Sequence, residues 1–231
     1  RLYDYANTVL SEYDKLKKEI DMIRASEEGT VELLVAYDIL RYLTPDCILE
    51  FQKKYPNVTF SYMEYPDRIV EKMLLDKEGN VALSIGPFAG DCFDMKSLKK
   101  CSLGLLVYEG HSLAKKREAT ILDLEGEPLY LENSSFKLNE FIQSRCWNRG
   151  FEPDIVFETN GFDLCYKMCR LKRGISVTID FVHEDMNTEG LVMIPFAEDD
   201  MIWEIGLLTL KDRAMESSVE KFYKYIEKYN S

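Results

Sequence analysis

Polar residues that could bind a small ligand follow four of the strands expected in this sequence. The four strand–helix junctions are Tyr37-Asp38-Ile39, Gly86-Pro87-Phe88, Asn133-Ser134-Ser135-Phe136 and Thr159-Asn160-Gly161-Phe162. In open α/β sheets, ligands bind beyond the carboxyl ends of the strands, where helix N-termini offer free N–H groups. A single Asn or Ser is enough to cap a helix, and capping alone is the alternative role for these residues. Asn133, Ser134 and Ser135 exceed that requirement, which favours a site for a carboxylate or another small anion.

The sequence contains no residue pattern typical of catalysis. The motifs G-x-S-x-G, H-E-x-x-H, G-x-G-x-x-G and the phosphate-binding P-loop are all absent. Of the two histidines, His111 is expected in a surface turn and His183 near the end of a strand, beside acidic residues. No nucleophile, base and orienting group come together. We therefore predict a binding protein with no catalytic residue, metal or cofactor, rather than an enzyme.

The number and spacing of the cysteines indicate the cellular compartment of the protein. There are six, irregularly spaced, at Cys47, Cys92, Cys101, Cys146, Cys165 and Cys169. This dilute pattern differs from the disulfide framework of small secreted proteins and favours a cytoplasmic protein with reduced thiols. Cys165 and Cys169 would share one face of a helix, as small apolar residues rather than half of a zinc site, because the other ligands at zinc spacing are missing. A redox pair of Cys92 and Cys101 is kept as an alternative for those two residues.

The elements that would position the junctions alternate between strands and helices. Strands are expected at 31–36, 58–64 and 81–85, with helices at 38–54 and 66–76 between them. This β-α-β-α-β order predicts a mainly parallel sheet with helices on both faces. Further strands are expected at 103–109, 129–131, 156–157, 175–179 and 203–210, with a segment at 191–195 leading back toward the first half. Further helices are expected at 111–117, 120–125, 135–149, 162–172 and 213–229.

The first 23 residues carry an apolar heptad repeat. Its positions, separated by alternating steps of four and three, are Leu2, Ala6, Val9, Tyr13, Leu16, Ile20 and Ile23. A narrow apolar seam with this period is typical of a coiled coil. We predict a linking or dimerising helix; an amphipathic helix packed on its own domain is the alternative.

Length and charge narrow the class of protein further. The chain has 231 residues, 46% of them hydrophobic, and a formal net charge of −12. That is one large domain or two modest ones, with enough residues to bury a core without disulfides or metals. No apolar run approaches the roughly 20 residues of a membrane span. Because the phosphate backbone attracts basic surfaces, we do not expect these residues themselves to hold DNA.

Several short motifs, in order along the chain, resemble the effector-binding region of LysR-type transcriptional regulators. They are Gly29–Val35, Leu49–Val58 with its Phe-x-x-x-Tyr-Pro-x-Val ending, Val81–Gly86, Gly110–Ala114 and Leu171–Val177, and the resemblance covers about residues 1–230. The sequence departs from the family pattern at Asn80, where an acid is usual, at Ser112 and Asp180, where proline is usual, and at Arg173-Gly174. These departures bear on the identity of the effector more than on the fold.

The resemblance implies a type 2 periplasmic-binding-protein-like fold, with two α/β lobes joined by a two-strand hinge. A linker helix at 1–28 would precede lobe I, at 29–106 and 196–231, and lobe II, at 107–195. A winged helix-turn-helix domain would lie before Arg1, outside this chain. The effector would bind in the cleft between the lobes. By position, the cleft candidates are Tyr37, Asp38, Pro87, Phe88, Ser134, Ser135, Phe136, Asn160, Gly161 and Thr178.

The function implied by the resemblance is ligand sensing in a cytoplasmic transcription regulator. The partners would be a small effector, with a carboxylate favoured, a second copy in a homodimer or tetramer, and DNA through the missing N-terminal domain, with no membrane contact. Two alternatives are an extracytoplasmic solute-binding protein of the same fold and an enzyme on the same scaffold, such as a small-molecule transferase. The heptad and the scattered cysteines count against the first alternative, and the missing acid/base pair counts against the second.

Overall fold

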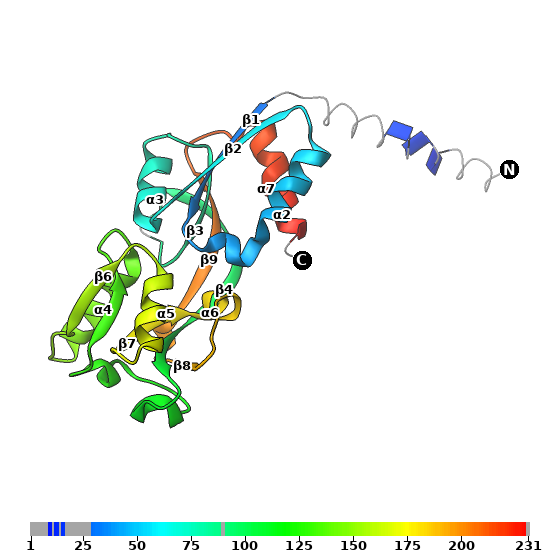
Figure 1. The fold of residues 1–231 in the computed structure, drawn as a ribbon. Coiled ribbons are helices and arrows are strands. Elements are labelled where there is room, and N and C mark those ends of the chain that lie inside the picture. Colours follow the sequence, from blue (N-terminus) through cyan, green and yellow to red (C-terminus); the bar gives the residue numbers. More distant parts are fainter. Residues whose placement is uncertain (1–8, 11, 14, 17–28, 89–90, 230–231) are drawn as a thin grey trace.

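The computed structural model describes residues 9–10, 12–13, 15–16, 29–88 and 91–229. The strands of these residues form one continuous hydrogen-bonded sheet (Figure 1). The pairing order is β2-β1-β3-β9-β4-β7-β5-β6, and β8 also pairs with β4. The first half contains β1 (Gly29–Ala36), β2 (Val58–Tyr65) and β3 (Val81–Ile85). The second half contains β5 (Leu129–Glu132), β6 (Ile155–Thr159), β7 (Ile175–Ile179) and β8 (Leu191–Pro195).

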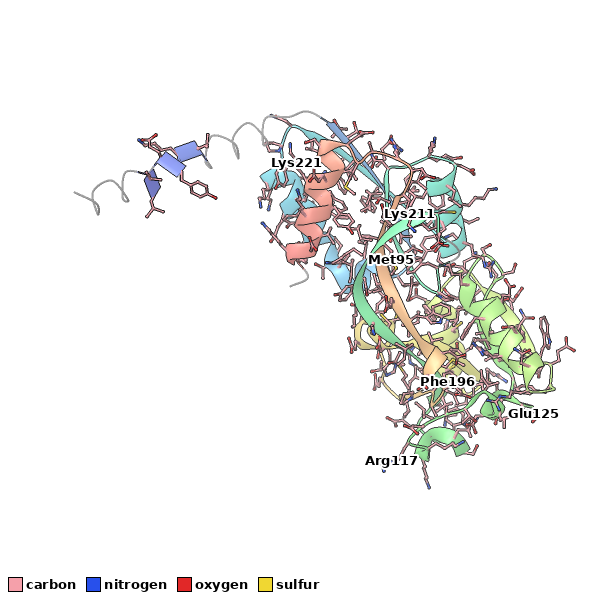
Figure 2. The ribbon with its side chains drawn as sticks, turned by 180° about the vertical axis from the view of Figure 1, so that it is seen from behind. Met95, Arg117, Glu125, Phe196, Lys211 and Lys221 are labelled. Carbon is pink, nitrogen blue, oxygen red and sulfur yellow. The ribbon has the colours of Figure 1, made fainter. Side chains whose placement is uncertain are left out.

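Two long strands, β4 (Phe93–Tyr108) and β9 (Ile202–Leu210), connect the halves. Residues 93–102 of β4 pair antiparallel with β9, whereas residues 103–106 pair with β7 and residues 104–108 with β8. Seen from behind, β4, which carries the labelled Met95, lies side by side with β9 (Figure 2). The chain returns from β8 to β9 through Phe196 and the 3-10 turn η3 (Asp199–Met201). The halves are therefore linked by the middle of β4 and by the connection from β8 to β9.

Helices cover the strands of both halves. In the first half, α2 (Ile39–Lys54) and α7 (Ser217–Tyr229) lie on one side of β1 and β2, and α3 (Asp67–Leu75) lies on the other (Figure 1). The Phe51 ring of α2 and the Phe222 ring of α7 meet edge to face, with centroids 5.0 Å apart. The second half carries α4 (Lys137–Asn148), α5 (Phe162–Arg170) and α6 (Asp180–Asp185). Within the described residues, no helix combines the length and the apolar character that crossing a membrane requires.

The sheet is mixed rather than mainly parallel. As expected from residues 29–85, β1 pairs in parallel with both β2 and β3, and β5 pairs in parallel with β6 and β7. The pairings of β3 with β9, and of β4 with β7, β8 and β9, are antiparallel. The parallel pairing predicted from the β-α-β-α-β order of residues 31–85 is confirmed. The antiparallel pairings come from the two strands that carry the chain between the halves, because these run against their neighbours.

Other differences from the sequence-based expectations concern element boundaries. The strand expected at 103–109 begins ten residues earlier, at Phe93, because residues 93–102 form an edge segment that pairs with β9 and keeps many polar side chains. The helices expected at 111–117 and 120–125 are 3-10 turns of four residues each, η1 (Ser112–Lys115) and η2 (Ile121–Leu124). The last helix begins at Ser217 rather than at 213.

Three positions of the predicted heptad fall on described residues. Val9, Tyr13 and Leu16 are helical, and their exposed fractions are 68%, 62% and 55%. The other heptad positions lie outside the described residues. The described apolar side chains of this segment are therefore exposed and could pack against another protein surface.

Asn80, where the family pattern has an acid, bonds the turn before β3 to β1. Its Nδ2 donates to the Thr30 carbonyl at 2.9 Å, and its Oδ1 accepts from the Glu32 N–H at 2.9 Å. The side chain is buried. An ionised acid could accept from Glu32 but could not donate to Thr30, so the amide satisfies both backbone groups.

We predict that Asn80→Ala lowers the free energy of unfolding by about 1–3 kcal/mol, because a buried backbone N–H loses its acceptor. Urea unfolding followed by circular dichroism measures the change. Asn148→Ala, at an exposed position at the end of α4, is the control and should stay within about 0.5 kcal/mol of the parent. Equal effects of the two substitutions would show that the Asn80 bonds do not stabilise the fold.

Candidate functional site

Three hollows have walls from both halves, and two of them share Tyr37 and Asp38. The outer hollow has a volume of about 540 Å³ and is lined by Tyr37, Asp38, Leu40, Arg41, Thr44, Pro45, Glu64, Asn160, Gly161, Asp163 and Asp185. The inner hollow has a volume of about 20 Å³, room for about one water molecule. It is lined by Ala36, Tyr37, Asp38, Ile39, Asp67, Ile85, Glu132, Phe136, Leu138, Phe162, Ile179, Phe181 and Trp203. Together the two hollows form the cleft.

One arginine connects the halves across the outer hollow. Asp38 begins α2 in a left-handed conformation, with φ of 68°, and its Oδ1 accepts from Arg41 Nε at 2.5 Å. The same guanidinium group reaches Asp185 of α6 at 2.7 Å and Asp163 of α5 at 3.6 Å. Burial raises the pKa of Asp38, and the Arg41 hydrogen bond acts against that rise. The Arg41 guanidinium group thus pairs with three carboxylates, which come from both halves of the molecule.

A buried acid lies at the inner hollow. Glu132, the last residue of β5, is 4% exposed. None of the hydrogen bonds between described residues reaches its carboxyl group. Burial raises its pKa well above the usual range, and the nearby carboxyl groups of Asp38 and Asp67 raise it further. Aromatic rings of Phe136, Phe162, Phe181 and Trp203 form much of the remaining wall.

Lys137, at the start of α4, inserts into the first half. Its backbone N–H donates to Asp67 Oδ1 at 3.0 Å, and its ammonium group donates to the Ile85 carbonyl at 2.7 Å and to Glu71. The ammonium nitrogen also lies 4.7 Å from the centre of the Phe88 ring. Burial raises the pKa of Asp67 to about 6, although the Lys137 charge and N–H act against that rise. The two halves are therefore joined by a buried polar contact as well as by the two strands.

The predicted site residues fall into three groups. Tyr37 and Asp38 line both hollows, Phe136 lines the inner one, and Asn160 and Gly161 line the outer one. Pro87 and Phe88 line a different hollow of about 470 Å³, beside Phe141, Arg145 and Trp203.

The remaining three predicted residues line neither hollow of the cleft. Ser134 is exposed, and the Ser135 N–H donates to Asn133 Oδ1 at 2.8 Å in a local turn. Asn133 Nδ2 also donates to Asn160 Oδ1 at 2.6 Å, which ties two junctions together. Thr178 is fully buried, with its Oγ1 2.9 Å from the Tyr166 hydroxyl.

Most charged residues of the cleft were missed in the sequence analysis. Arg41, Asp163 and Asp185 come from helices of both halves and meet only in the folded chain. Two signals were present. Glu132 ends the otherwise apolar strand segment Leu129-Tyr130-Leu131, and Asp67 begins a helix directly after Pro66.

The histidines and cysteines lie outside both hollows. His111 Nδ1 accepts from the Leu113 N–H at 3.2 Å in the expected turn, and His183 Nδ1 lies 3.1 Å from the Tyr166 hydroxyl. All six cysteines are free thiols, and burial raises the pKa of Cys169 to about 12. In the part of the chain that the structure describes, no three His, Cys, Asp or Glu side chains form a group that could hold a metal ion.

Comparisons with known proteins identify the family. The family model of the LysR substrate binding domain matches residues 24–230, so the chain belongs to this family. The uncharacterized HTH-type transcriptional regulator YwbI of Bacillus subtilis is 25% identical over 185 residues, which are 80% of this chain and 62% of YwbI. The transcriptional dual regulator GltC of Bacillus subtilis is 23% identical over 229 residues, which are 98% of this chain and 76% of GltC. The match thus spans less than two thirds of the length of YwbI.

A solved structure supports the fold. The regulatory domain of Synechocystis PCC6803 CcmR, in complex with 2-PG, matches with a TM-score of 0.78 at 16% identity, covering 88% of this chain and 98% of that chain. The fold is the type 2 periplasmic-binding-protein-like fold of LysR effector-binding domains. The fold class expected from the sequence is confirmed.

We predict that Lys137→Met lowers the free energy of unfolding by about 3–5 kcal/mol, because Glu71 keeps a buried charge without its cation. Adding Glu71→Gln to the same chain should recover much of the loss, since the buried charge is then removed. Arg68→Ala is the control, because the Arg68–Glu140 ion pair also joins the halves but is exposed and should contribute less than about 1 kcal/mol. A Lys137→Met loss no larger than that of Arg68→Ala would contradict the prediction.

We also predict a pH-dependent gain in stability for Glu132→Gln. Folding raises the pKa of Glu132, so the parent loses stability as the pH rises through the interval between its unfolded and folded pKa values. Glutamine does not ionise, and the variant should therefore gain relative to the parent by up to about 1.4 kcal/mol per pH unit in that interval. Urea unfolding between about pH 5 and pH 9 measures the difference. The exposed control Glu125→Gln (Figure 2) should show no such trend, and a flat difference for Glu132→Gln would refute the assignment.

Proposed function

We propose that this chain is the ligand-sensing regulatory domain of a LysR-type transcription factor, and that it binds a small effector in the cleft. The observation that carries this proposal is the position of the two hollows between the halves. Contacts from Arg41 cross the outer hollow, and contacts from Lys137 join the halves beside the inner one, where Asp67 lines the wall. A ligand that binds one arrangement of the halves better than another shifts the equilibrium between them. Such a change in the arrangement of the halves can be transmitted to any domain attached to the chain.

We assign the lobes as the family resemblance implies, with lobe I at 29–106 and 196–231 and lobe II at 107–195. The change of pairing partner along β4, from β9 up to residue 102 to β7 from residue 103, supports a division close to this boundary. Five of the ten sequence-predicted residues remain our candidates for effector contact, because Tyr37, Asp38, Phe136, Asn160 and Gly161 line the cleft.

The partners of the whole protein follow from the same proposal. The exposed apolar side chains of Val9, Tyr13 and Leu16 support pairing of the 1–28 helix in a homodimer or tetramer. The net charge of −12 supports a division of labour in which a winged helix-turn-helix domain outside this chain contacts DNA. A regulator of this kind works in the cytoplasm, where its DNA target lies.

The two alternative functions have less support. The relatives are transcriptional regulators, which disfavours an extracytoplasmic solute-binding protein. Among the described residues that line the two hollows there is no histidine, cysteine or serine to act as a base or nucleophile. We therefore propose that the domain binds its effector without transforming it.

Filling the cleft tests the proposal. Gly161 lines the outer hollow, its φ of 169° suits any residue, and a Cβ there would meet no atom within 4 Å. We predict that Gly161→Trp folds normally but loses at least about 90% of its ligand response, because the indole occupies the space that the effector needs. The measurement is thermal shift against a panel of small carboxylates, amines, sugars and phosphates.

Asn148→Trp, at an exposed position outside the lining of both hollows, is the matched control. Compounds that stabilise the parent and Asn148→Trp but not Gly161→Trp identify the cleft as the binding site. A panel in which no compound distinguishes the two variants would overturn the proposal.

A further inference from the structure

We propose that the effector of this cleft is an organic cation: an ammonium or guanidinium group on a small, largely apolar frame. This inference rests on the proposed ligand-sensing function and specifies the chemistry of the same site. The cationic group would bind at the inner hollow, between Glu132 and Asp38, and the frame would lie in the outer hollow. Tyr37 and Asp38 line both hollows and would contact both parts of the ligand.

The charges of the residues that line the cleft favour a cationic ligand. Among the described residues, six carboxyl groups line the two hollows, those of Asp38, Glu64, Asp67, Glu132, Asp163 and Asp185. Arg41 is the only basic side chain among the described residues of this lining, and three of these carboxylates already share it. Lys137 is engaged by Glu71 and the Ile85 carbonyl and lines neither hollow. An anionic ligand would therefore meet excess negative charge, whereas a cation would reduce it.

The Glu132 carboxyl group, which lacks a hydrogen-bond partner among the described residues, also favours a cationic ligand. Its side chain is 4% exposed and lines the inner hollow, and no hydrogen bond within the described structure uses its carboxyl group. A site that keeps such a group next to an empty space is suited to a ligand that supplies the partner. An ammonium group, which is close to a water molecule in size, supplies donors and the opposite charge.

The walls match the rest of such a ligand. Phe136, Phe162 and Phe181 line the inner hollow and offer aromatic surfaces, which attract cations as well as apolar groups. The serines that favoured an anion in the sequence, Ser134 and Ser135, line neither hollow. The structure therefore moves the expected contact from the start of α4 to the end of β5.

Two isosteric series test the sign of the charge. The first is benzylamine, benzyl alcohol and benzoate, and the second is 1,4-diaminobutane, 1,4-butanediol and succinate. Isothermal titration of the chain with each compound should show binding by an amine at least about tenfold tighter than by the matching alcohol or carboxylate. Tighter binding by the carboxylates, or no binding by either amine, would overturn the proposal.

Three variants locate the contact. Glu132→Gln should weaken amine binding by at least about tenfold, because an amide offers the cation no charge. Asp163→Asn, at the exposed rim, should weaken it less, since solvent screens that carboxylate. Ser134→Ala with Ser135→Ala should leave amine binding unchanged, whereas an anion site at the start of α4 would depend on both serines. Unchanged amine binding in Glu132→Gln would contradict the proposal.

Proton release gives a readout that a purely structural role for Glu132 would not produce. The groups around its carboxyl group are Asp38, Asp67 and Cys165, and the two aspartates favour its protonated form. When the ammonium group replaces the proton, the carboxyl group ionises and releases that proton to the buffer. The observed binding enthalpy should then change with the ionisation enthalpy of the buffer in the parent but not in Glu132→Gln. A buffer-independent enthalpy in the parent would count against direct contact with Glu132.

The outcomes separate this inference from the proposed function. Stabilisation by an anion that disappears in Gly161→Trp would leave the ligand-sensing function standing and overturn the cationic effector. Failure of every compound class to distinguish Gly161→Trp from Asn148→Trp would count against both.

Discussion

The ammonium group of Lys137 belongs to one half of the molecule but lies buried in the other. Removing a charged group from water is costly, and here that cost is offset by Glu71, the Ile85 carbonyl and the face of the Phe88 ring. All three partners belong to the first half, so the contact exists only while the halves stay together. The Lys137 contacts therefore help to hold α4 against α3, beside the inner hollow. The exposed Arg68–Glu140 pair joins the same helices but, screened by water, can contribute little.

The cleft next to this contact contains buried carboxyl groups that lower the stability of the fold. Glu132 and Asp67 both have raised pKa values because burial disfavours their charged forms. A core selected for stability alone would place apolar side chains at these positions. Functional sites are where proteins keep such unfavourable groups, because a ligand can provide the missing partner. The carboxyl groups of the cleft therefore indicate more about binding than about folding.

Local patterns predicted the local parts of this structure well. The strands observed at 81–85 and 175–179 have the predicted bounds. Gly150, with φ of 90°, follows α4 in the left-handed conformation that glycine adopts easily. After α5 the left-handed residue is Lys172, and Gly174 is needed for space instead, since a Cβ there would lie 2.1 Å from the Pro128 carbonyl oxygen.

Apart from Asp38, the charged residues of the cleft were not among the predicted site residues, because their meeting depends on how distant segments pack. Arg41 is close in sequence only to Asp38, and its other partners lie more than a hundred residues away in α5 and α6. The serines were favoured because they follow a strand, yet the turn built by Asn133 uses the Ser135 N–H for itself. Sequence spacing identifies the ends of strands, but it does not indicate which side chains at those ends face the cleft.

The double pairing of β4 limits how the two halves can move. Its hydrogen bonds to β9 end at residue 102 and those to β7 begin at residue 103, so no slack segment separates the two ladders. A movement of the halves that keeps both ladders intact must therefore bend or twist β4 itself.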